Sequence, residues 1–359
     1  MRSVLPQALW FDLLDTKTFL KLNRDPSFLE QRIEAQPRGT WVVIDEVQKI
    51  PILLDTVHKI MGRFPNRRLF ALSGSSARKL KRLGTNLLAG RAVNRSFYPL
   101  TSSELEFKVS VKTMLEFGNL PSVRLNLESA RDILDAYVTN YLKEEIQQEA
   151  LTKDLGSFSR FLEVAALCNG QAVNVSNISR DAAVARPTVQ RYFDVLIHTL
   201  IGLWIYPWKK RARIKEVGHP KFYFFDPGVV RAISGFLHDP IEQSEKGPLL
   251  ETLVLHELRA WQNTAQCGGQ IFYWRTPSGS EVDFVWTRGK TSVGIEIKSA
   301  TEWKSEYGRT LRGLYQEGVF QSVVGVYLGK DVLKEGALRV YPFFDFIRAL
   351  EKGQILRTP

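Results

Sequence analysis

Several features that define common classes of protein are scarce or missing in this chain of 359 residues. Only two cysteines are present, so a disulfide framework and a structural zinc site are not expected, and a reducing cytoplasm fits. No run of about 18 apolar residues occurs, which argues against a membrane span. The first residues also lack the apolar core of a signal peptide. These absences favour a cytoplasmic protein that does not cross a membrane.

The length of the chain indicates how many domains it has, and its charge indicates which binding partners are compatible with it. A chain of 359 residues predicts two or three domains. The net charge of +11 is compatible with binding to nucleic acid or another polyanion. Basic residues gather in two clusters, whose simpler interpretation is a solvated surface. The clusters run from Arg78 to Arg82 and from Lys209 to Lys215.

Residues 41–46, Trp-Val-Val-Ile-Asp-Glu, form an apolar run that ends at two carboxylates. This pattern is typical of a buried parallel strand, and strands and helices alternate from residue 8 to residue 72, which predicts a parallel sheet. Acids at the carboxyl end of such a strand face the crevice where open α/β sheets bind ligands. In nucleotide hydrolases the first acid holds magnesium and the second positions water. Asp45 and Glu46 are therefore candidate catalytic residues, and Asp45 is a candidate metal ligand.

A nucleotide site also needs a phosphate-binding loop of the form Gly-x-x-x-x-Gly-Lys-Ser/Thr. No glycine occurs before Gly39, so this loop is missing ahead of the acidic strand. The tripeptide Gly289-Lys290-Thr291 does not supply it, because Phe284 stands where the motif needs a glycine and the tripeptide is expected in a hairpin. The candidates for nucleotide contact are two serines that follow the third strand, Ser73 and Ser75, and Arg91. The alternative interpretation of Arg91 is a simple surface arginine.

The middle of the chain predicts a winged helix-turn-helix. Residues 177–196 form two short helices separated by a tight turn, with Pro187 in the first turn of the second helix. Residues 202–208 are expected to form the wing strand, and Asp226-Pro-Gly a later turn. The start of the second helix and the adjoining basic cluster are candidates for contact with DNA, although such modules also dock proteins. The candidates are Arg186, Thr188, Gln190, Arg191, Lys209, Lys210 and Arg211.

A second set of acidic residues lies on predicted strands near the C-terminus. Asp283 is on one strand, and Glu296 and Lys298 share one face of the next. Two acids and a lysine on one face can bind magnesium and stabilise a phosphorane-like transition state, and Glu251 on the preceding helix adds a third carboxylate. These four residues are the candidate catalytic and metal-binding set. The alternative is a simple ion pair between Glu296 and Lys298 on an exposed strand.

This second set resembles the PD-(D/E)xK nuclease fold of restriction endonucleases and Holliday-junction resolvases. Val282 takes the place of the proline that usually precedes the first acid. A helix over residues 303–317 and a strand over residues 322–327 are expected to close this unit. The resemblance implies a nuclease-like domain, while catalysis by it is a separate question.

The motifs taken together resemble the prokaryotic AAA-type ATPases whose C-terminal domain was long described as of unknown function. The resemblance implies an α/β protein with an AAA-like P-loop ATPase domain over 1–107, truncated before its Walker A loop. A helical and winged helix-turn-helix region over 108–220 and a restriction-endonuclease-like domain over 221–359 follow. The stretches that carry the resemblance are Val43 to Pro51, Leu72 to Leu80, Leu88 to Ala92, Phe224 to Gly228, Gly247 to Glu251, Glu281 to Val285 and Ile295 to Ser299.

The resemblance implies an ATP-binding protein that uses ATP and Mg²⁺, acts on DNA and can associate with itself. Loss of the Walker A loop would remove the backbone amides and the lysine that hold the phosphates, so weak or absent ATP hydrolysis is expected. It also suggests a start site assigned too far downstream or a degraded gene. Two alternatives remain open from the sequence: a Mg²⁺-dependent DNA nuclease centred on Asp283, Glu296 and Lys298, and a non-catalytic module that binds DNA or protein.

Overall fold

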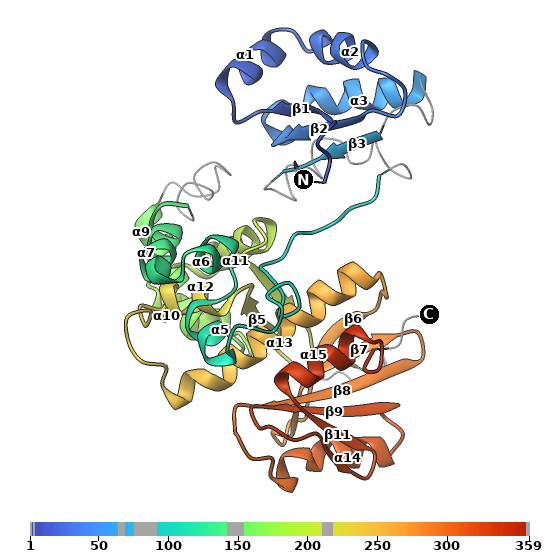
Figure 1. Ribbon diagram of the computed structural model, residues 1–359. Helices are drawn as coiled ribbons and strands as arrows, with labels where there is room; N and C mark the ends of the chain where they lie inside the picture. Colours follow the sequence, from blue (N-terminus) through green and yellow to red (C-terminus); the bar gives the residue numbers. More distant parts are fainter. Residues whose placement is uncertain are drawn as a thin grey trace. The chain divides into compact units, whose positions relative to one another are not determined.

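The computed structural model describes Arg2 and residues 4–63, 69–74, 92–141, 154–209 and 218–356 (Figure 1). The chain divides into two compact units. The first holds residues 1–94, and the second holds residues 95–359 apart from 198–200. The two carboxylate sets predicted from the sequence therefore lie in different units.

The first unit contains a parallel sheet with strand order β1-β2-β3, as the sequence predicted. In Figure 1 the three helices of this unit lie together on one side of the strands, as right-handed crossovers between successive parallel neighbours require. The strands are β1 (Leu9–Asp12), β2 (Trp41–Asp45) and β3 (Leu69–Leu72). The helices are α1 (Thr16–Arg24), α2 (Ser27–Glu34) and α3 (Ile52–Arg63), and a 3₁₀ turn spans Val47–Lys49.

Local chemistry explains where these elements begin and end. The stretch expected to be one helical region, 16–35, is two helices that are separated at Asp25 and Pro26. Asp15 caps the first by accepting a hydrogen bond from the backbone N–H of Thr18 at 2.8 Å. The middle of β2 is fully buried, and Leu29 and Val57 from the helices cover it from one side. Because this apolar strand is buried, its last residue, Asp45, lies at the carboxyl end of the central strand.

The second unit begins with a helical region that leads into a pair of antiparallel strands. Strands β4 and β5 pair antiparallel, and Ala172, between α9 and α10, bridges to Lys221 at the start of β5. The helices are α5 (Val111–Phe117), α6 (Pro121–Leu125), α7 (Ala130–Ala136), α9 (Leu155–Leu167), α10 (Val175–Asp181), α11 (Arg186–His198) and α12 (Pro227–Ile233). A 3₁₀ turn spans Leu127–Ser129, a π-helical turn spans Tyr137–Tyr141, and the strands are β4 (Gly202–Ile205) and β5 (Lys221–Phe224).

Two expectations for this region change on the structure. The amphipathic helix predicted from Ala130 is helical to Ala136 and then π-helical to Tyr141, and the rest of that stretch lies outside the described residues. The turn predicted at Asp226 was wrong. Asp226 instead caps α12, with its Oδ1 accepting from the N–H of Val229 at 3.1 Å. Proline at the first helical position and a capping aspartate favour a helix start at least as strongly as a turn.

The rest of the second unit is a six-stranded mixed sheet with order β10-β11-β9-β8-β7-β6. The strand over 322–327 was expected to close the unit, but β11 pairs parallel with it and extends the sheet. The strands are β6 (Gln270–Arg275), β7 (Glu281–Arg288), β8 (Thr291–Lys298), β9 (Ser322–Tyr327), β10 (Leu333–Glu335) and β11 (Leu338–Pro342). The helices are α13 (Gln243–Ala265), α14 (Arg309–Gln316) after a 3₁₀ turn at Ser305–Gly308, and α15 (Phe343–Glu351).

The residues that follow β4 connect the hairpin to this sheet. Pro207 forms a parallel bridge with Tyr273 of β6. The N–H of Tyr273 donates to the carbonyl of Tyr206 at 3.1 Å, and the N–H of Trp208 donates to the carbonyl of Tyr273 at 2.6 Å. The Trp208 ring stacks on Phe320, with 5.5 Å between ring centroids. The region that contains β4 and the C-terminal sheet are therefore joined through backbone pairing as well as through a shared apolar core.

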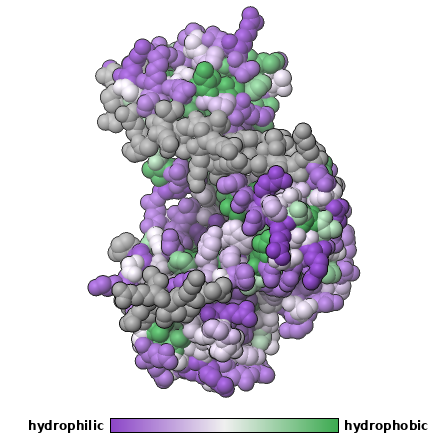
Figure 2. All heavy atoms as spheres, turned by 180° about the vertical axis from the view of Figure 1, so that it is seen from behind, coloured by the Kyte–Doolittle hydropathy of each residue, from purple (hydrophilic) through white to green (hydrophobic). Residues whose placement is uncertain are grey.

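The outer surface is mixed in character. On the face drawn in Figure 2, hydrophobic residues form small separate groups among hydrophilic ones. Among the described residues, no helix combines the length and the apolar character that crossing a membrane requires.

Candidate functional site

Asp283 lies where the pairing between β7 and β8 changes. The antiparallel ladder runs as far as Phe284 opposite Ile295. One step further, the Asp283 carboxylate accepts a hydrogen bond from the backbone N–H of Ile297 at 2.7 Å. Asp283 is only 7% exposed. A side chain that bonds to the neighbouring strand in this way is held in one position beside β8.

Glu296 and Lys298 project from β8 on the same face, as predicted, and bond to one another. The Lys298 ammonium donates to Glu296 Oε1 at 2.5 Å. The side chain of Lys298 is 31% exposed, whereas that of Glu296 is 9% exposed, so the pair does not lie on an open strand surface. The second oxygen, Glu296 Oε2, is buried and has no hydrogen-bond partner among the described residues.

Glu251 reaches the same place from α13. Its Oε2 accepts a hydrogen bond from the Tyr223 hydroxyl at 2.6 Å and lies 3.9 Å from the Lys221 ammonium. Lys221 is itself buried and forms an ion pair with Glu281. The sequence analysis missed Lys221, Tyr223 and Glu281 as site residues. The available signal was a lysine at the start of the apolar strand Lys-Phe-Tyr-Phe.

We use the name acidic cluster for Glu251, Asp283 and Glu296 together with Lys298. Burial first, and then the neighbouring Asp283 carboxylate, raise the pKa of Glu251 to about 7 and that of Glu296 to about 8. Burial also raises the pKa of Asp283. Burial alone would lower the pKa of Lys298, but the surrounding carboxylates outweigh it and raise that pKa. The carboxyl groups of the acidic cluster therefore hold protons more tightly than free carboxyl groups do, because burial and their proximity disfavour charging them together.

The oxygen ligands of the acidic cluster suit a hard divalent cation such as Mg²⁺ or Mn²⁺. The buried and unpartnered Glu296 Oε2, beside carboxylates that repel one another, is the observation that fits such a cation. Among the described residues, no group of three or more His, Cys, Asp and Glu side chains is already closed around a single point. The three carboxyl groups are thus close enough to interact electrostatically, and their side chains would have to rearrange to share one ion.

The acid pair of the first unit has different surroundings. The Ser73 hydroxyl, at the end of β3, donates to the Asp45 carboxylate, and the N–H of Glu46 donates to Ser73 Oγ at 3.3 Å. Glu46 has a left-handed backbone with φ of 58°, which is uncommon for a residue with a side chain, and Gln48 donates to its carboxylate at 2.5 Å. Ser73, a candidate for nucleotide contact, therefore lies beside the candidate metal ligand Asp45. Ser75 and Arg91 lie outside the described residues.

The proposed DNA-contact residues begin helix α11. Arg186, Gln190 and Arg191 are exposed, and Thr188 is half-buried. Their neighbours Tyr192 and Phe193 are buried in the core, as predicted. Lys209 is exposed after the β4 strand. Lys210 and Arg211 lie outside the described residues.

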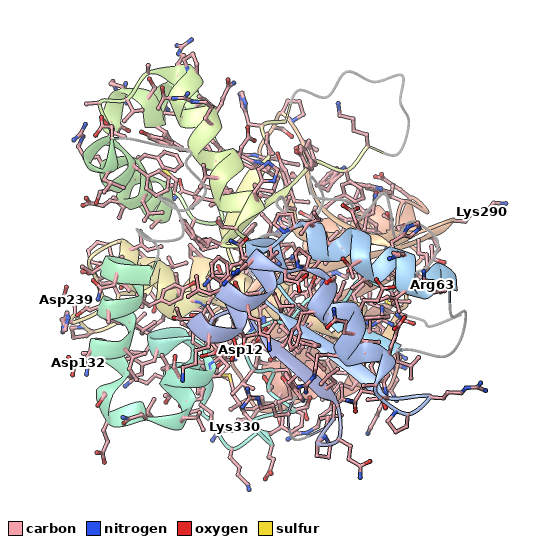
Figure 3. The ribbon with its side chains drawn as sticks, turned by 90° about the horizontal axis from the view of Figure 1, so that it is seen from above. Asp12, Arg63, Asp132, Asp239, Lys290 and Lys330 are labelled. Carbon is pink, nitrogen blue, oxygen red and sulfur yellow. The ribbon has the colours of Figure 1, made fainter. Side chains whose placement is uncertain are left out.

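The rejected phosphate loop is a hairpin turn. Arg288 pairs with Thr291 across β7 and β8, so Gly289 and Lys290 form a two-residue turn between them. Gly289 has φ of 59°, as such turns require. Lys290 points outward from this turn in Figure 3. The prediction that this tripeptide lies in a hairpin is confirmed.

Three family models match successive parts of the chain. An AAA domain matches residues 2–106, a domain of unknown function (DUF8612) matches residues 109–239, and another (DUF4143) matches residues 246–346. The AAA domain at the N-terminus and DUF4143 at the C-terminus support the predicted prokaryotic AAA-type ATPase family, and the AAA domain indicates an ATPase-like protein. Proteins with AAA domains in general use ATP and Mg²⁺.

Two mycobacterial proteins are similar over most of the chain. They are the uncharacterized proteins Rv2008c of Mycobacterium tuberculosis and Mb2031c of Mycobacterium bovis. Each is 26% identical over 323 residues, which cover 88% of this chain and 69% of the relative.

Two solved structures were also found. Protein VC1899 from Vibrio cholerae aligns at 11% identity over 89% of this chain and 90% of its own, with a TM-score of 0.25. Can2 from Sulfobacillus thermosulfidooxidans in complex with cyclic tetra-adenylate aligns at 13% identity over 91% of this chain and 94% of its own, with a TM-score of 0.23. TM-scores this low do not establish a shared fold.

Proposed function

We propose that the acidic cluster is a divalent-cation site that cleaves phosphodiester bonds in DNA, within an AAA-type ATPase-like protein. The observation that carries the proposal is the convergence of Glu251, Asp283 and Glu296 from three separate elements beside Lys298. A helix carboxylate, a strand carboxylate and a Glu-x-Lys pair on the next strand are the arrangement predicted from the PD-(D/E)xK resemblance. When bound, a divalent cation stabilises the charge that develops on a phosphoryl group under attack.

The residues of the acidic cluster have separable tasks in this proposal. Asp283, held by the N–H of Ile297, would be a fixed ligand that could offer its other oxygen to the cation. Glu296 offers Oε2, because Lys298 holds its Oε1. Lys298 is about one-third exposed, so its ammonium can also hydrogen-bond to a phosphate oxygen of an incoming strand.

A cleavage assay on the full chain tests this function. Supercoiled, linear and single-stranded DNA would be incubated with Mg²⁺ or Mn²⁺, and with excess chelator. We expect cleavage that needs the metal and is lost in Asp283→Asn. The control Asp345→Asn changes an exposed aspartate on α15 that pairs with Arg348 and should leave cleavage unchanged. Cleavage that persists in Asp283→Asn, or no cleavage of any substrate by the unaltered chain, would reject the nuclease assignment in favour of a non-catalytic module.

DNA is the proposed substrate because the exposed start of α11 lies in the same unit as the acidic cluster. Arg186, Gln190 and Arg191 can reach phosphates or base edges in a groove. Binding that weakens with salt and falls in an Arg186→Ala, Arg191→Ala double variant would support this surface. Binding that ignores both salt and the double variant would place the DNA elsewhere or favour a protein partner.

A second proposed activity is nucleotide binding at the end of β2, with Asp45 as the Mg²⁺ ligand and Glu46 orienting water. The bond from Ser73 to Asp45 favours it, because it places a hydroxyl from the next strand beside the proposed magnesium ligand. Titration of the chain with labelled ATP and ADP, with and without Mg²⁺, tests it together with a hydrolysis assay. Asp45→Asn should remove the Mg²⁺-dependent part of the affinity. An unchanged Mg²⁺ dependence in that variant would contradict the assignment.

A further inference from the structure

Strand β5 has two faces with different neighbours. Residues 222 and 224 alternate with residues 221 and 223 along the strand. The Phe222 ring packs against Trp204 of the neighbouring wing strand, with 5.0 Å between centroids. The Tyr223 ring packs in the other direction against Phe284 of β7, at 5.6 Å. One face of β5 therefore belongs to the helix-turn-helix region and the other to the C-terminal sheet.

The two side chains of β5 that face the C-terminal sheet, Lys221 and Tyr223, both approach one carboxylate oxygen, Glu251 Oε2. Tyr223 donates its hydroxyl hydrogen to Glu251 Oε2 at 2.6 Å, and the Lys221 ammonium is 3.9 Å from the same atom. Lys221 also pairs with Glu281 and lies 5.4 Å from the centre of the Tyr273 ring. Glu251 belongs to α13, yet both groups that restrain its carboxylate come from β5.

Strand β5 is itself fixed along both edges. On one side it pairs with β4 over its whole length. On the other, Gly170 donates its N–H to the carbonyl of Phe222 at 2.8 Å, and Ala172 bridges to Lys221. A strand bonded along both edges cannot turn the Cα–Cβ bonds of its residues to the other face without breaking backbone hydrogen bonds. The positions of Lys221 and Tyr223 relative to Glu251 are therefore set by the hairpin.

We propose that Tyr223 and Lys221 are positioning residues that hold Glu251 for cation binding, so that the wing hairpin is an integral part of the acidic cluster. The inference rests on the proposed metal site and adds a role for residues outside the predicted set. Its consequence is that the helix-turn-helix region cannot be treated as a detachable binding module. Partners of a metal ligand that fix its orientation typically change metal affinity by roughly 10–100-fold when removed.

The test measures Mn²⁺ affinity of the full chain from the electron paramagnetic resonance signal of free Mn²⁺. Tyr223→Phe removes only the hydroxyl and keeps the ring packing. We expect it to weaken Mn²⁺ binding by about 10-fold or more. The matched control is Tyr273→Phe, which also removes a buried hydroxyl bond, at 2.6 Å to the carbonyl of His219, but leaves Glu251 untouched. Its Mn²⁺ affinity should stay within about twofold of the unaltered chain.

Lys221 needs a different pair of variants, because removal of its charge acts in two ways. Lys221→Met removes a cation near the metal, and reduced repulsion alone would tighten Mn²⁺ binding. A positioning role instead predicts weaker binding, with partial recovery in Lys221→Arg. Thermal melting of each variant shows that the chain remains folded during the measurement.

The outcomes separate this inference from the function on which it rests. No Mn²⁺ binding by the unaltered chain, or binding that survives in Asp283→Asn, overturns the proposed metal site and the inference with it. Binding that is lost in Asp283→Asn but unchanged in Tyr223→Phe overturns the inference alone. Tighter binding in Lys221→Met removes Lys221 from the positioning role. Weakened binding in Tyr223→Phe, with the Tyr273→Phe control unaffected, supports it.

Discussion

Two pairs of carboxylates lie on strands of this chain or directly after them, and their surroundings differ. Asp45 is partly exposed, and a neutral hydroxyl from Ser73 satisfies one of its oxygens. Asp283 and Glu296 are each 7% exposed and lie among further carboxylates and two lysines. A buried, crowded carboxylate is costly unless a cation joins it, whereas a partly exposed one is solvated. The difference shows that the side chains packed around an acid, and not its position on a strand, decide whether it belongs to a buried cluster of charged groups.

The largest expected effect comes from exchanging one acid in each unit for its amide. Glu296→Gln should lower metal-dependent DNA cleavage by roughly 100-fold or more, because several kcal/mol of charge stabilisation depend on the metal site. Glu46→Gln should leave cleavage unchanged and should lower only the ATP hydrolysis that the unaltered chain retains without its Walker A loop. Both variants are assayed for both activities. If the two variants lower the same activity, the two acid pairs do not form independent sites.

A buried carboxyl outside both sites shows what burial does without a lysine nearby. Glu257 on α13 is 2% exposed and accepts from the N–H of Ser102 at 2.8 Å and from its hydroxyl. Burial raises the pKa of Glu257 from 4.5 to about 7. The folded state therefore holds the proton more tightly, so stability is lost as pH rises from about 4.5 to about 7 and stays lost above that.

Glu257→Gln should remove this loss. We expect the variant to be more stable than the unaltered chain by about 3 kcal/mol at pH 8, since each pKa unit is worth about 1.4 kcal/mol. Near pH 4 the two should be equal. Urea unfolding at both pH values measures the difference. A gain of the same size at both pH values would show that packing, and not the buried charge, is responsible.

In the first unit the expected effect is smaller. Ser73→Ala removes the hydroxyl that bonds to Asp45 and to the N–H of Glu46, and should cost about 1 kcal/mol of unfolding free energy. Denaturant unfolding followed by hydrogen exchange should locate the loss in residues 4–63. Ser27→Ala, which changes an exposed hydroxyl on α2, is the control and should have little effect. A loss confined to the second unit would contradict the prediction.

The smallest effect is expected at a helix cap of the second unit. Asn174 accepts hydrogen bonds from the N–H groups of Ser176 and Asn177 at 2.9 and 3.4 Å and so begins α10. Asn174→Ala should cost about 0.5–1 kcal/mol, and Asn174→Asp, which preserves the cap, should cost less. Thermal unfolding measures both. Equal losses in the two variants would mean that the capping bonds contribute little.

The sequence predicted those parts of the fold that depend on neighbours in the chain. Strand β9 spans Ser322–Tyr327, the bounds predicted from the sequence, because a continuous apolar run is a local pattern. Asp283, Glu296 and Lys298 were also placed together, since a register between adjacent strands follows from a short hairpin.

The remaining parts depend on contacts between distant segments. The contact of Tyr223 with Glu251 needs strand β5 to pack on α13, and no local pattern records that packing. From the sequence, we expected β9 to be the last strand of the unit. The pairing of β11 with β9 is likewise a contact that no local pattern records. Asp226 was misassigned for another reason, because the same residues that favour turns also cap helices.

The pairing of residues 206–208 with β6 has a consequence for the behaviour of the chain in concentrated solution. Exposed sheet edges recruit strands from other molecules and so promote aggregation. Here the backbone groups of Tyr273, in the middle of the β6 edge, are already bonded to Tyr206 and Trp208. The opposite edge is β10, which is only three residues long. Loosening of the wing segment would therefore uncover the longer edge and favour intermolecular strand pairing.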